Sequence, residues 1–279
     1  MAGVPDRPGR RRRGSLRLGT VRSGGSVGGD ADVASVANLV GEPARAAALM
    51  ALLDGRPKPA GVLAAEAGVA PSTMSGHLAR LVAGGLVTVR REGRQRVYGL
   101  ARPEVAQALE ALARVAPRQS VRSLRQGTYA EALRRARTCY DHLAGRLGVA
   151  LLDGLLARGL LEEESGDACL GGPPSRSYRL TPSGRAALAC VGVDLSSSGR
   201  RPLVRPCVDW SERRPHLAGA LGARLLRRLL ELGWLRLGER RIVLVTASGR
   251  TALEEVLGVD PASWDLALLP PGAGLDRAQ

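Results

Sequence analysis

Four side chains in the second half of the chain have the chemistry to bind a metal ion or to sense an oxidant. Cys139 and His142 are three residues apart, and Cys207 and His216 follow in the same order further along the chain. On a helix, a spacing of three places two side chains on one face, where a thiolate and an imidazole can chelate a soft metal. The sequence therefore predicts a site for a soft or borderline ion such as Zn, Cd or Pb at Cys139, His142, Cys207 and His216.

The same residues also have a purely structural interpretation. The repeated Cys-x-Asp pattern, which includes Asp141 and Asp209, is typical of a helix start, and Asp209 with Glu212 matches a capping box. A buried cysteine also packs as a small hydrophobic residue. The remaining cysteines are weaker candidates for a ligand, because Cys169 lies in a polar loop and Cys190 at a predicted helix end.

Catalysis is a third interpretation of the thiol and imidazole. Cys139 with His142 could form a nucleophile and base pair. No oxyanion loop, phosphate-binding glycine motif or pair of catalytic acids accompanies them, so we do not expect an enzyme.

An internal repeat positions the four residues. Each copy continues from the Cys–His segment into a Leu-rich helix that ends at a glycine, Gly159 in the first and Gly233 in the second. Each copy then shows a hairpin pattern and closes on Thr-x-Ser-Gly-Arg at the start of another helix. Two copies predict a pseudo-symmetric, duplicated helix–hairpin–helix domain over residues 119–265 rather than a solenoid. The matched segments are 139–148 with 207–222, and 181–185 with 246–250.

A second candidate site lies in the first half of the chain. Residues 63–69 predict a short helix that turns at Gly68, and a second helix follows at once. In that second helix Met74, Leu78 and Leu81 share one face, so small polar side chains face the opposite way. This arrangement is typical of a helix-turn-helix whose outer face enters the major groove of DNA. The expected base-contacting residues are Ser72, Thr73, Ser75, Gly76 and Arg80.

Residues 87–100 alternate on both sides of Glu92-Gly93, which predicts a β-hairpin wing. Its arginines are placed to reach phosphates or the minor groove, although a solvated charged turn is the other interpretation. His77 lies beside the apolar face of the preceding helix, which favours a half-buried structural role. The arginines of the wing are Arg90, Arg91, Arg94 and Arg96.

Composition favours double-stranded DNA as the partner. The 279 residues carry 41 basic and 26 acidic side chains, a net charge of +15, which points to a polyanion. Only 3% of the residues are aromatic, whereas single-strand binders rely on aromatic stacking. Residues 1–30, which include Arg10–Arg13, predict a disordered basic arm, and residues 266–279 a disordered tail.

Four cysteines are too few for a disulfide scaffold in a chain of this length. No uncharged apolar run approaches the about 18 residues that span a bilayer, and the arginine-rich start lacks the apolar stretch of a secretory signal. These features predict a cytoplasmic protein with reduced thiols and no membrane contact.

The segment from Asp32 to about Val115 resembles the ArsR (arsenical-resistance-repressor) family of winged helix-turn-helix regulators. The resemblance implies a homodimer built through the flanking helices, and repression that an effector relieves. The familiar metal sites of the family do not carry over, because Lys58–Val62 lacks Cys-x-Cys and Pro103–Val115 lacks histidine. The resemblance rests on Leu63-Ala64, Gly68-Val69, Ser72-Thr73-Met74-Ser75, His77-Leu78, Leu81, Gly85-Leu86-Val87, Arg91-Glu92-Gly93-Arg94, Tyr98 and Leu100.

Together these patterns predict a mainly α fold with small β-hairpins (α+β), with a winged helix-turn-helix domain at residues 31–118 and the duplicated domain after it. The expected function is a sequence-specific DNA-binding regulator, a repressor released by a metal, redox or small-molecule effector. A basic nucleoid-type protein that binds DNA without sequence preference is the alternative. It would account for the arginines but not for a separate duplicated domain.

Overall fold

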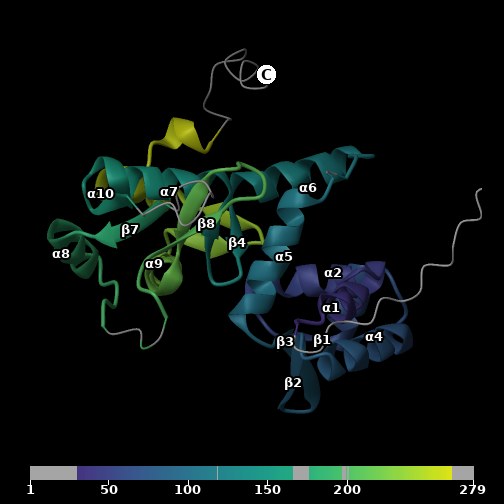
Figure 1. Cartoon of the computed structure of the whole chain (residues 1–279). Helices are drawn as coiled ribbons and strands as arrows, with labels where there is room; N and C mark the ends of the chain where they lie inside the picture. Colours follow the sequence, from purple (N-terminus) through teal and green to yellow (C-terminus); the bar gives the residue numbers. More distant parts are fainter. Residues whose placement is uncertain (1–29, 118, 166–175, 197–198, 200, 266–279) are drawn as a thin grey trace, which may run out of the picture.

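The computed structural model describes residues 30–117, 119–165, 176–196, 199 and 201–265 (Figure 1). These residues form two hydrophobic cores. The segments 1–29 and 266–279 and Cys169 lie outside the described residues. Within the described part of the chain, no single helix is long and apolar enough to cross a membrane. The segments Val33–Val40 and Pro43–Asp54 meet that criterion only as a pair bent by 87°.

The first core belongs to a winged helix-turn-helix, as the sequence predicts. Its strands form one antiparallel sheet in the order β1-β3-β2. The α4 helix begins at Pro71, a residue whose fixed φ suits a first helical turn, and buries Met74, Leu78 and Leu81. The elements are α1 (Val33–Val40), α2 (Pro43–Ala51), η1 (Leu52–Asp54), β1 (Lys58–Pro59), α3 (Ala60–Ala67), α4 (Pro71–Ala83), β2 (Val87–Glu92), β3 (Gln95–Leu100) and α5 (Pro103–Val115).

After α6 (Leu124–Arg135), the order hairpin, helix, hairpin, helix occurs twice along the chain, and each occurrence of this element order is referred to as a copy. Thr181 and Thr246 cap the final helix of each copy, and their hydroxyl oxygens accept hydrogen bonds from Gly184 N and Gly249 N. The first copy comprises β4 (Arg137–Cys139), β5 (His142–Ala144), α7 (Gly145–Ala157), β6 (Leu161–Ser165), β7 (Arg176–Leu180) and α8 (Pro182–Cys190). The second comprises β8 (Arg205–Val208), β9 (Pro215–Ala218), α9 (Gly219–Glu231), β10 (Leu235–Leu237), β11 (Val243–Val245) and α10 (Ala247–Leu257), and a short η2 (Pro261–Ser263) follows.

The two copies interlock rather than stand side by side. The α7 helix packs on β9 of the other copy, and α9 packs on β5. Glycines begin the two helices tightly, because a Cβ atom on Gly148 would lie 2.6 Å from the Leu143 carbonyl oxygen, and one on Gly222 would lie 2.5 Å from the Leu217 carbonyl oxygen. A Cβ atom on Gly222 would also lie 3.3 Å from His142 Cβ. The second core therefore joins both copies and brings the two Cys–His hairpins together.

Candidate functional site

The α4 helix presents a small, polar outer face. Ser72, Thr73 and Arg80 are exposed, as are Ser75 and Gly76, while the opposite apolar face is buried. The Ser75 hydroxyl donates to the Pro71 carbonyl oxygen at 2.9 Å, so its oxygen is oriented by the helix and still has acceptor capacity. The predicted recognition face is therefore geometrically able to enter a DNA groove.

The wing stands beside this face. The hairpin of β2 and β3 turns at Gly93, with φ +58°, and its four arginines are exposed. Arg91 and Arg96 are direct cross-strand neighbours, and like charges in such a pair repel each other unless an anion lies between them. Arg90 forms an exposed ion pair with Glu92 at 2.5 Å.

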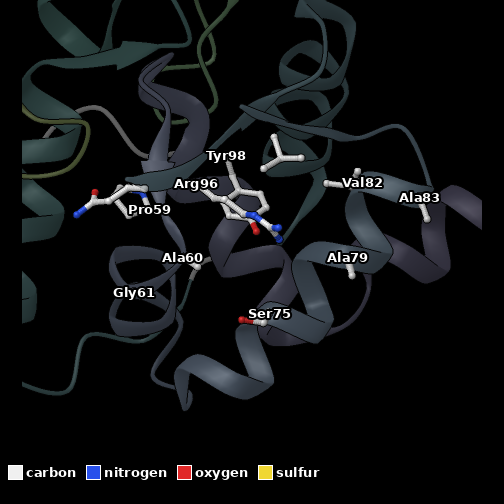
Figure 2. A pocket seen from close by; sticks show the side chains of 11 residues that line it. Pro59, Ala60, Gly61, Ser75, Ala79, Val82, Ala83, Arg96 and Tyr98 are labelled. Carbon is white, nitrogen blue, oxygen red and sulfur yellow. The ribbon is translucent and has the colours of Figure 1, made fainter. Parts of the chain in front are cut away.

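A groove of about 820 Å³ separates α4 from the wing (Figure 2). Ser75 lines it from the helix and Arg96 from the wing, so both predicted elements face the same space. His77 lies outside this groove: its side chain is 16% exposed, and Nδ1 lies 3.5 Å from Glu42 Oε2. The groove is lined by Pro59, Ala60, Gly61, Ser75, Ala79, Val82, Ala83, Val89, Gln95, Arg96 and Tyr98.

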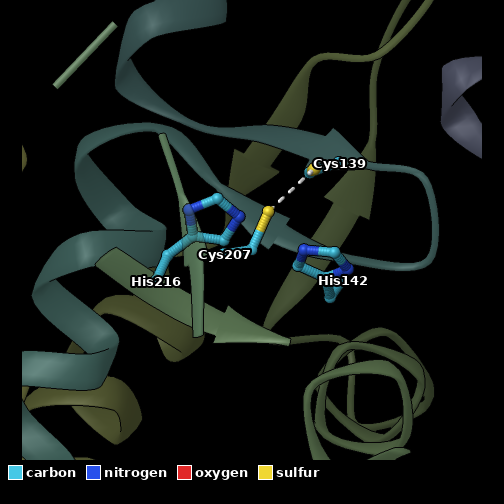
Figure 3. Close-up of side chains that lie close together, drawn as sticks. All are labelled: Cys139, His142, Cys207 and His216. Atoms are coloured by element: carbon cyan, nitrogen blue, oxygen red, sulfur yellow. Dashed lines mark hydrogen bonds between the residues drawn. The ribbon is translucent and has the colours of Figure 1, made fainter. Parts of the chain in front are cut away.

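The Cys–His cluster forms where hairpins β4–β5 and β8–β9 meet (Figure 3). The donor atoms of Cys139, His142, Cys207 and His216 all lie within 4.8 Å of one another. The two Sγ atoms are 3.9 Å apart, and the two imidazole rings stack with centroids 5.1 Å apart. The expectation that the four residues meet in space therefore agrees with the geometry.

The expected helical placement of these residues is wrong. Cys139 ends β4 and His142 begins β5, and the two are paired across the hairpin. Cys207 and His216 are paired in the same way between β8 and β9. Residues three apart become neighbours in a hairpin with a two-residue turn, so the spacing alone did not distinguish the hairpin from a helix.

Three buried imidazole nitrogens of the cluster have no hydrogen-bond partner among the described residues. His142 Nε2 and both ring nitrogens of His216 lack a hydrogen bond, although the two residues are only 4% and 0% exposed. On the far side of each ring lies a carboxylate: Asp141 Oδ1 is 3.1 Å from His142 Nδ1, and Asp209 Oδ2 is 3.8 Å from His216 Nδ1. The Asp141 carboxylate, at hydrogen-bond distance, fixes the tautomer and orientation of His142 as such carboxylates do for metal-binding histidines. Asp209 contributes only its negative charge to the surroundings of His216.

The electrostatics of the cluster favour one thiolate. A hydrogen bond from the Cys139 thiol, together with both histidines, lowers the pKa of Cys207, whereas the same bond and burial raise the pKa of Cys139. Burial would lower the pKa of His142, but its hydrogen bond to Asp141 and its contact with Cys207 outweigh burial and raise it. Of the two cysteines, Cys207 is therefore the one whose surroundings favour the thiolate, the form of cysteine that binds metals.

A buried ion pair joins β4 of the first hairpin to the β8–β9 turn of the second. Arg137 Nη2 donates to both carboxylate oxygens of Asp209 at 2.8 Å, and both residues are fully buried. Asp209 also accepts from Gly145 N at 2.7 Å and from Ser211 N at 2.8 Å. Asp209 Oδ1 also accepts from Glu212 N at 3.1 Å, as the predicted capping box requires. The predicted helix start is wrong, because Asp209 lies in the turn between β8 and β9 and no helix begins there.

Several residues that contribute to this site were not identified from the sequence. Arg137 precedes Cys139 by two positions, as Arg205 precedes Cys207, and this repeated Arg-x-Cys pattern was the available signal. Tyr140 carries no local signal for its φ of 62° in the β4–β5 turn. Cys190 is exposed at the end of α8, away from the cluster.

Comparisons with known proteins agree with the winged-helix geometry. Residues 40–90 match a family model described as a helix-turn-helix domain. YdfF of Bacillus subtilis, named as an uncharacterised HTH-type transcriptional regulator, is 37% identical over 231 residues, 82% of this chain and 98% of that protein. That match is longer than the winged-helix segment and therefore extends into the second core.

The HTH-type transcriptional regulator CmtR of Mycobacterium tuberculosis is 42% identical over 83 residues, 30% of this chain and 70% of that protein. An NMR structure of CmtR, titled a cadmium metal sensor, shares 36% identity and covers 33% of this chain and 99% of its own, with a TM-score of 0.27. With the recognition helix and wing in place and a relative that matches over most of the chain, the protein belongs to the ArsR family of winged helix-turn-helix regulators and is a DNA-binding transcriptional regulator.

Proposed function

We propose that this regulator reads one discrete operator in double-stranded DNA through α4 and its wing. The observation that carries the proposal is the exposed polar face of α4 beside a wing with four exposed arginines, one of which, Arg96, lines the groove between them. Ser72, Thr73, Ser75, Gly76 and Arg80 contact base edges, and Arg90, Arg91, Arg94 and Arg96 contact phosphates or the minor groove.

The regulator acts as a cytoplasmic homodimer. Exposed apolar side chains on the helices at both ends of the winged helix support this assembly: Val33 and Val36 on α1, and Leu112 and Val115 on α5. Val33 is 70% and Val115 is 80% exposed, so both side chains are free to pack against a second copy of the chain. Two winged helices joined in this way would meet half-sites about 34 Å apart.

We further propose that residues 31–118 form the DNA-binding domain and residues 119–265 a duplicated effector domain without enzymatic activity. The repeated element order and the two matching threonine caps support the duplication. The effector is a soft or borderline metal ion bound by Cys139, His142, Cys207 and His216, and its binding releases the repressor from DNA.

The donor set fits such an ion. Two thiolates and two imidazoles are typical of tetrahedral Zn²⁺ or Cd²⁺ sites and unlike the oxygen ligands of Mg²⁺ or Ca²⁺. A tetrahedral ion with Zn–S bonds of about 2.3 Å holds its sulfurs about 3.8 Å apart, close to the 3.9 Å between the two Sγ atoms. When bound, the ion would supply a cross-link between the two hairpins.

Footprinting of the full-length protein on genomic fragments, including the region near its own gene, tests the DNA-binding proposal. Protection of one discrete site is expected. Uniform coverage that depends only on protein concentration would favour the nucleoid-type alternative.

Metal analysis of anaerobically purified protein tests the effector site. One ion per chain is expected in the parent and in Cys190→Ser, which removes an exposed thiol away from the cluster. Cys139→Ser and Cys207→Ser should lose that ion. Equal metal content in all four proteins would contradict the site, whereas a response to peroxide that both serine variants lose would support redox sensing instead.

A further inference from the structure

The turn between two of the proposed metal ligands reaches into the DNA-binding half. Tyr140 and Asp141 connect Cys139 to His142, and the Tyr140 side chain packs against the core of the winged helix. Its backbone N donates to the Leu53 carbonyl oxygen at 2.7 Å. One end of the metal cluster is therefore joined directly to η1, the segment that follows α2.

This contact depends on two unusual backbone conformations. Tyr140 has a φ of 62°, a left-handed conformation that is costly for an aromatic residue and persists only where its surroundings hold it. On the other side, Gly55 has a φ of +71°, and a Cβ atom there would lie 2.8 Å from the Tyr140 carbonyl oxygen. The docked turn is therefore a strained arrangement that fits only a glycine partner.

A second set of contacts joins β4 to α5 of the DNA-binding half through Arg241. Thr138, which precedes Cys139, exchanges backbone and side-chain hydrogen bonds with Arg241: Thr138 N donates to Arg241 O, and Arg241 Nε donates to Thr138 O. Arg241 Nη2 in turn lies 2.5 Å from Glu110 Oε1 on α5, and both side chains are buried. Cys139 thus lies between two contacts to the DNA-binding half.

We propose that the Tyr140 turn couples metal occupancy to DNA affinity, an inference that rests on the proposed metal site. An ion bound to both Cys139 and His142 fixes the ends of the turn and so favours the docked conformation of Tyr140. Without the ion, the strain at Tyr140 is relieved when the turn leaves the winged helix. A ligand shifts such an equilibrium by its difference in affinity for the two states.

Coupling of this kind is reciprocal. If metal changes the operator Kd by a given factor, operator DNA changes the metal Kd by the same factor. Couplings between two sites in proteins are typically about 5- to 150-fold. We therefore expect saturating metal to raise the operator Kd of the parent protein by at least about fivefold.

The test uses Tyr140→Gly in the full-length protein. Glycine adopts the left-handed conformation without strain and keeps the backbone N–H, but it removes the side chain that enters the winged-helix core. The matched control is Arg213→Gly, an exposed residue with a φ of 57° in the β8–β9 turn. Operator Kd is measured by fluorescence anisotropy with and without saturating Cd²⁺, and Cd²⁺ Kd is measured by thiolate absorbance.

Tyr140→Gly should bind Cd²⁺ and operator but lose the coupling, with a ratio of operator Kd values near one, while Arg213→Gly keeps the parent ratio. Gly55→Ala should lose the coupling as well, because its Cβ displaces the Tyr140 carbonyl. Gly85→Ala, with a φ of +67° and open space around it, should keep the coupling. These glycine variants decide the matter if Tyr140→Gly proves unfolded.

Retention of the full ratio in both Tyr140→Gly and Gly55→Ala would overturn the inference. So would a parent that binds Cd²⁺ and operator independently, a result that leaves the metal site intact. A parent that binds operator but no metal would overturn the proposed metal site and the coupling together.

Discussion

Replacement of Asp209 by asparagine should unfold the second core at much lower urea concentration. The substitution keeps the size of the side chain but leaves Arg137 as a buried charge with no carboxylate, and it weakens the bonds from Gly145 N and Ser211 N. Breaking a buried ion pair by removing one partner costs about 3–5 kcal/mol. With a urea m-value of about 1–3 kcal/mol/M, the midpoint should fall by about 1 M or more.

Tryptophan fluorescence is a selective assay for this change, because all three tryptophans lie after residue 200. Trp210 is also a direct reporter, since the Arg137 guanidinium lies 4.5 Å from its ring centroid. Measurements in chelator remove any contribution from metal. The control is Asp153→Asn, whose ion pair with Arg214 is 45% and 57% exposed, and which should cost less than about 1 kcal/mol.

The pH dependence gives a second check on the same pair. Burial would raise the pKa of Asp209, but the positive charge of Arg137 and the hydrogen bonds that the Asp209 carboxylate accepts lower this pKa well below its usual range. Its stabilising contribution is therefore complete above the unfolded pKa of about 3.9 and is lost as the pH falls toward the folded value. The gap between parent and variant should shrink below about pH 4. A variant that matches the control at neutral pH, or a gap unchanged in acid, would refute the reasoning.

Three further changes have defined outcomes. Arg91→Ala with Arg94→Ala should weaken binding to all DNA sequences alike and reduce the slope of log K against log salt by about 0.9 per lost phosphate contact; an unchanged slope in anisotropy titrations would place the wing away from DNA. Gly249→Ala should destabilise the second core in urea titrations, because its Cβ would overlap the Trp234 carbonyl, whereas Gly61→Ala, with open space around it, should not. Cadmium occupancy should fall as the pH drops from 8 toward 5, since protons compete for thiolates and imidazoles; occupancy that is constant across this range in dialysed samples would contradict the ligand set.

The winged helix could be predicted because its signals are local. Apolar spacing in α4, the glycine turn at Gly68 and strand alternation on both sides of Gly93 each depend on neighbours in the sequence. The polar face of α4 follows from the same periodicity. Which of its side chains contact bases stays a prediction.

The Cys–His cluster was harder to predict because its geometry is non-local. The repeat indicated that four residues could meet, but a spacing of three fits both a helix and a two-residue hairpin turn. Tyr140 is a poor turn residue by its type, so the sequence carried no hairpin signal there. The pairing of Arg137 with Asp209, 72 positions apart, depends on how the two copies interlock.

Recognition of an operator by the α4 face is tested most directly by a competition titration with Arg80→Ala. The measurement compares the Kd for the footprinted operator with the Kd for scrambled DNA at one salt concentration, for parent and variant. The account predicts a loss of about 1–3 kcal/mol on the operator and little change on scrambled DNA, so that the specificity ratio falls about 5- to 150-fold. An unchanged ratio would contradict the assignment of this face to base recognition.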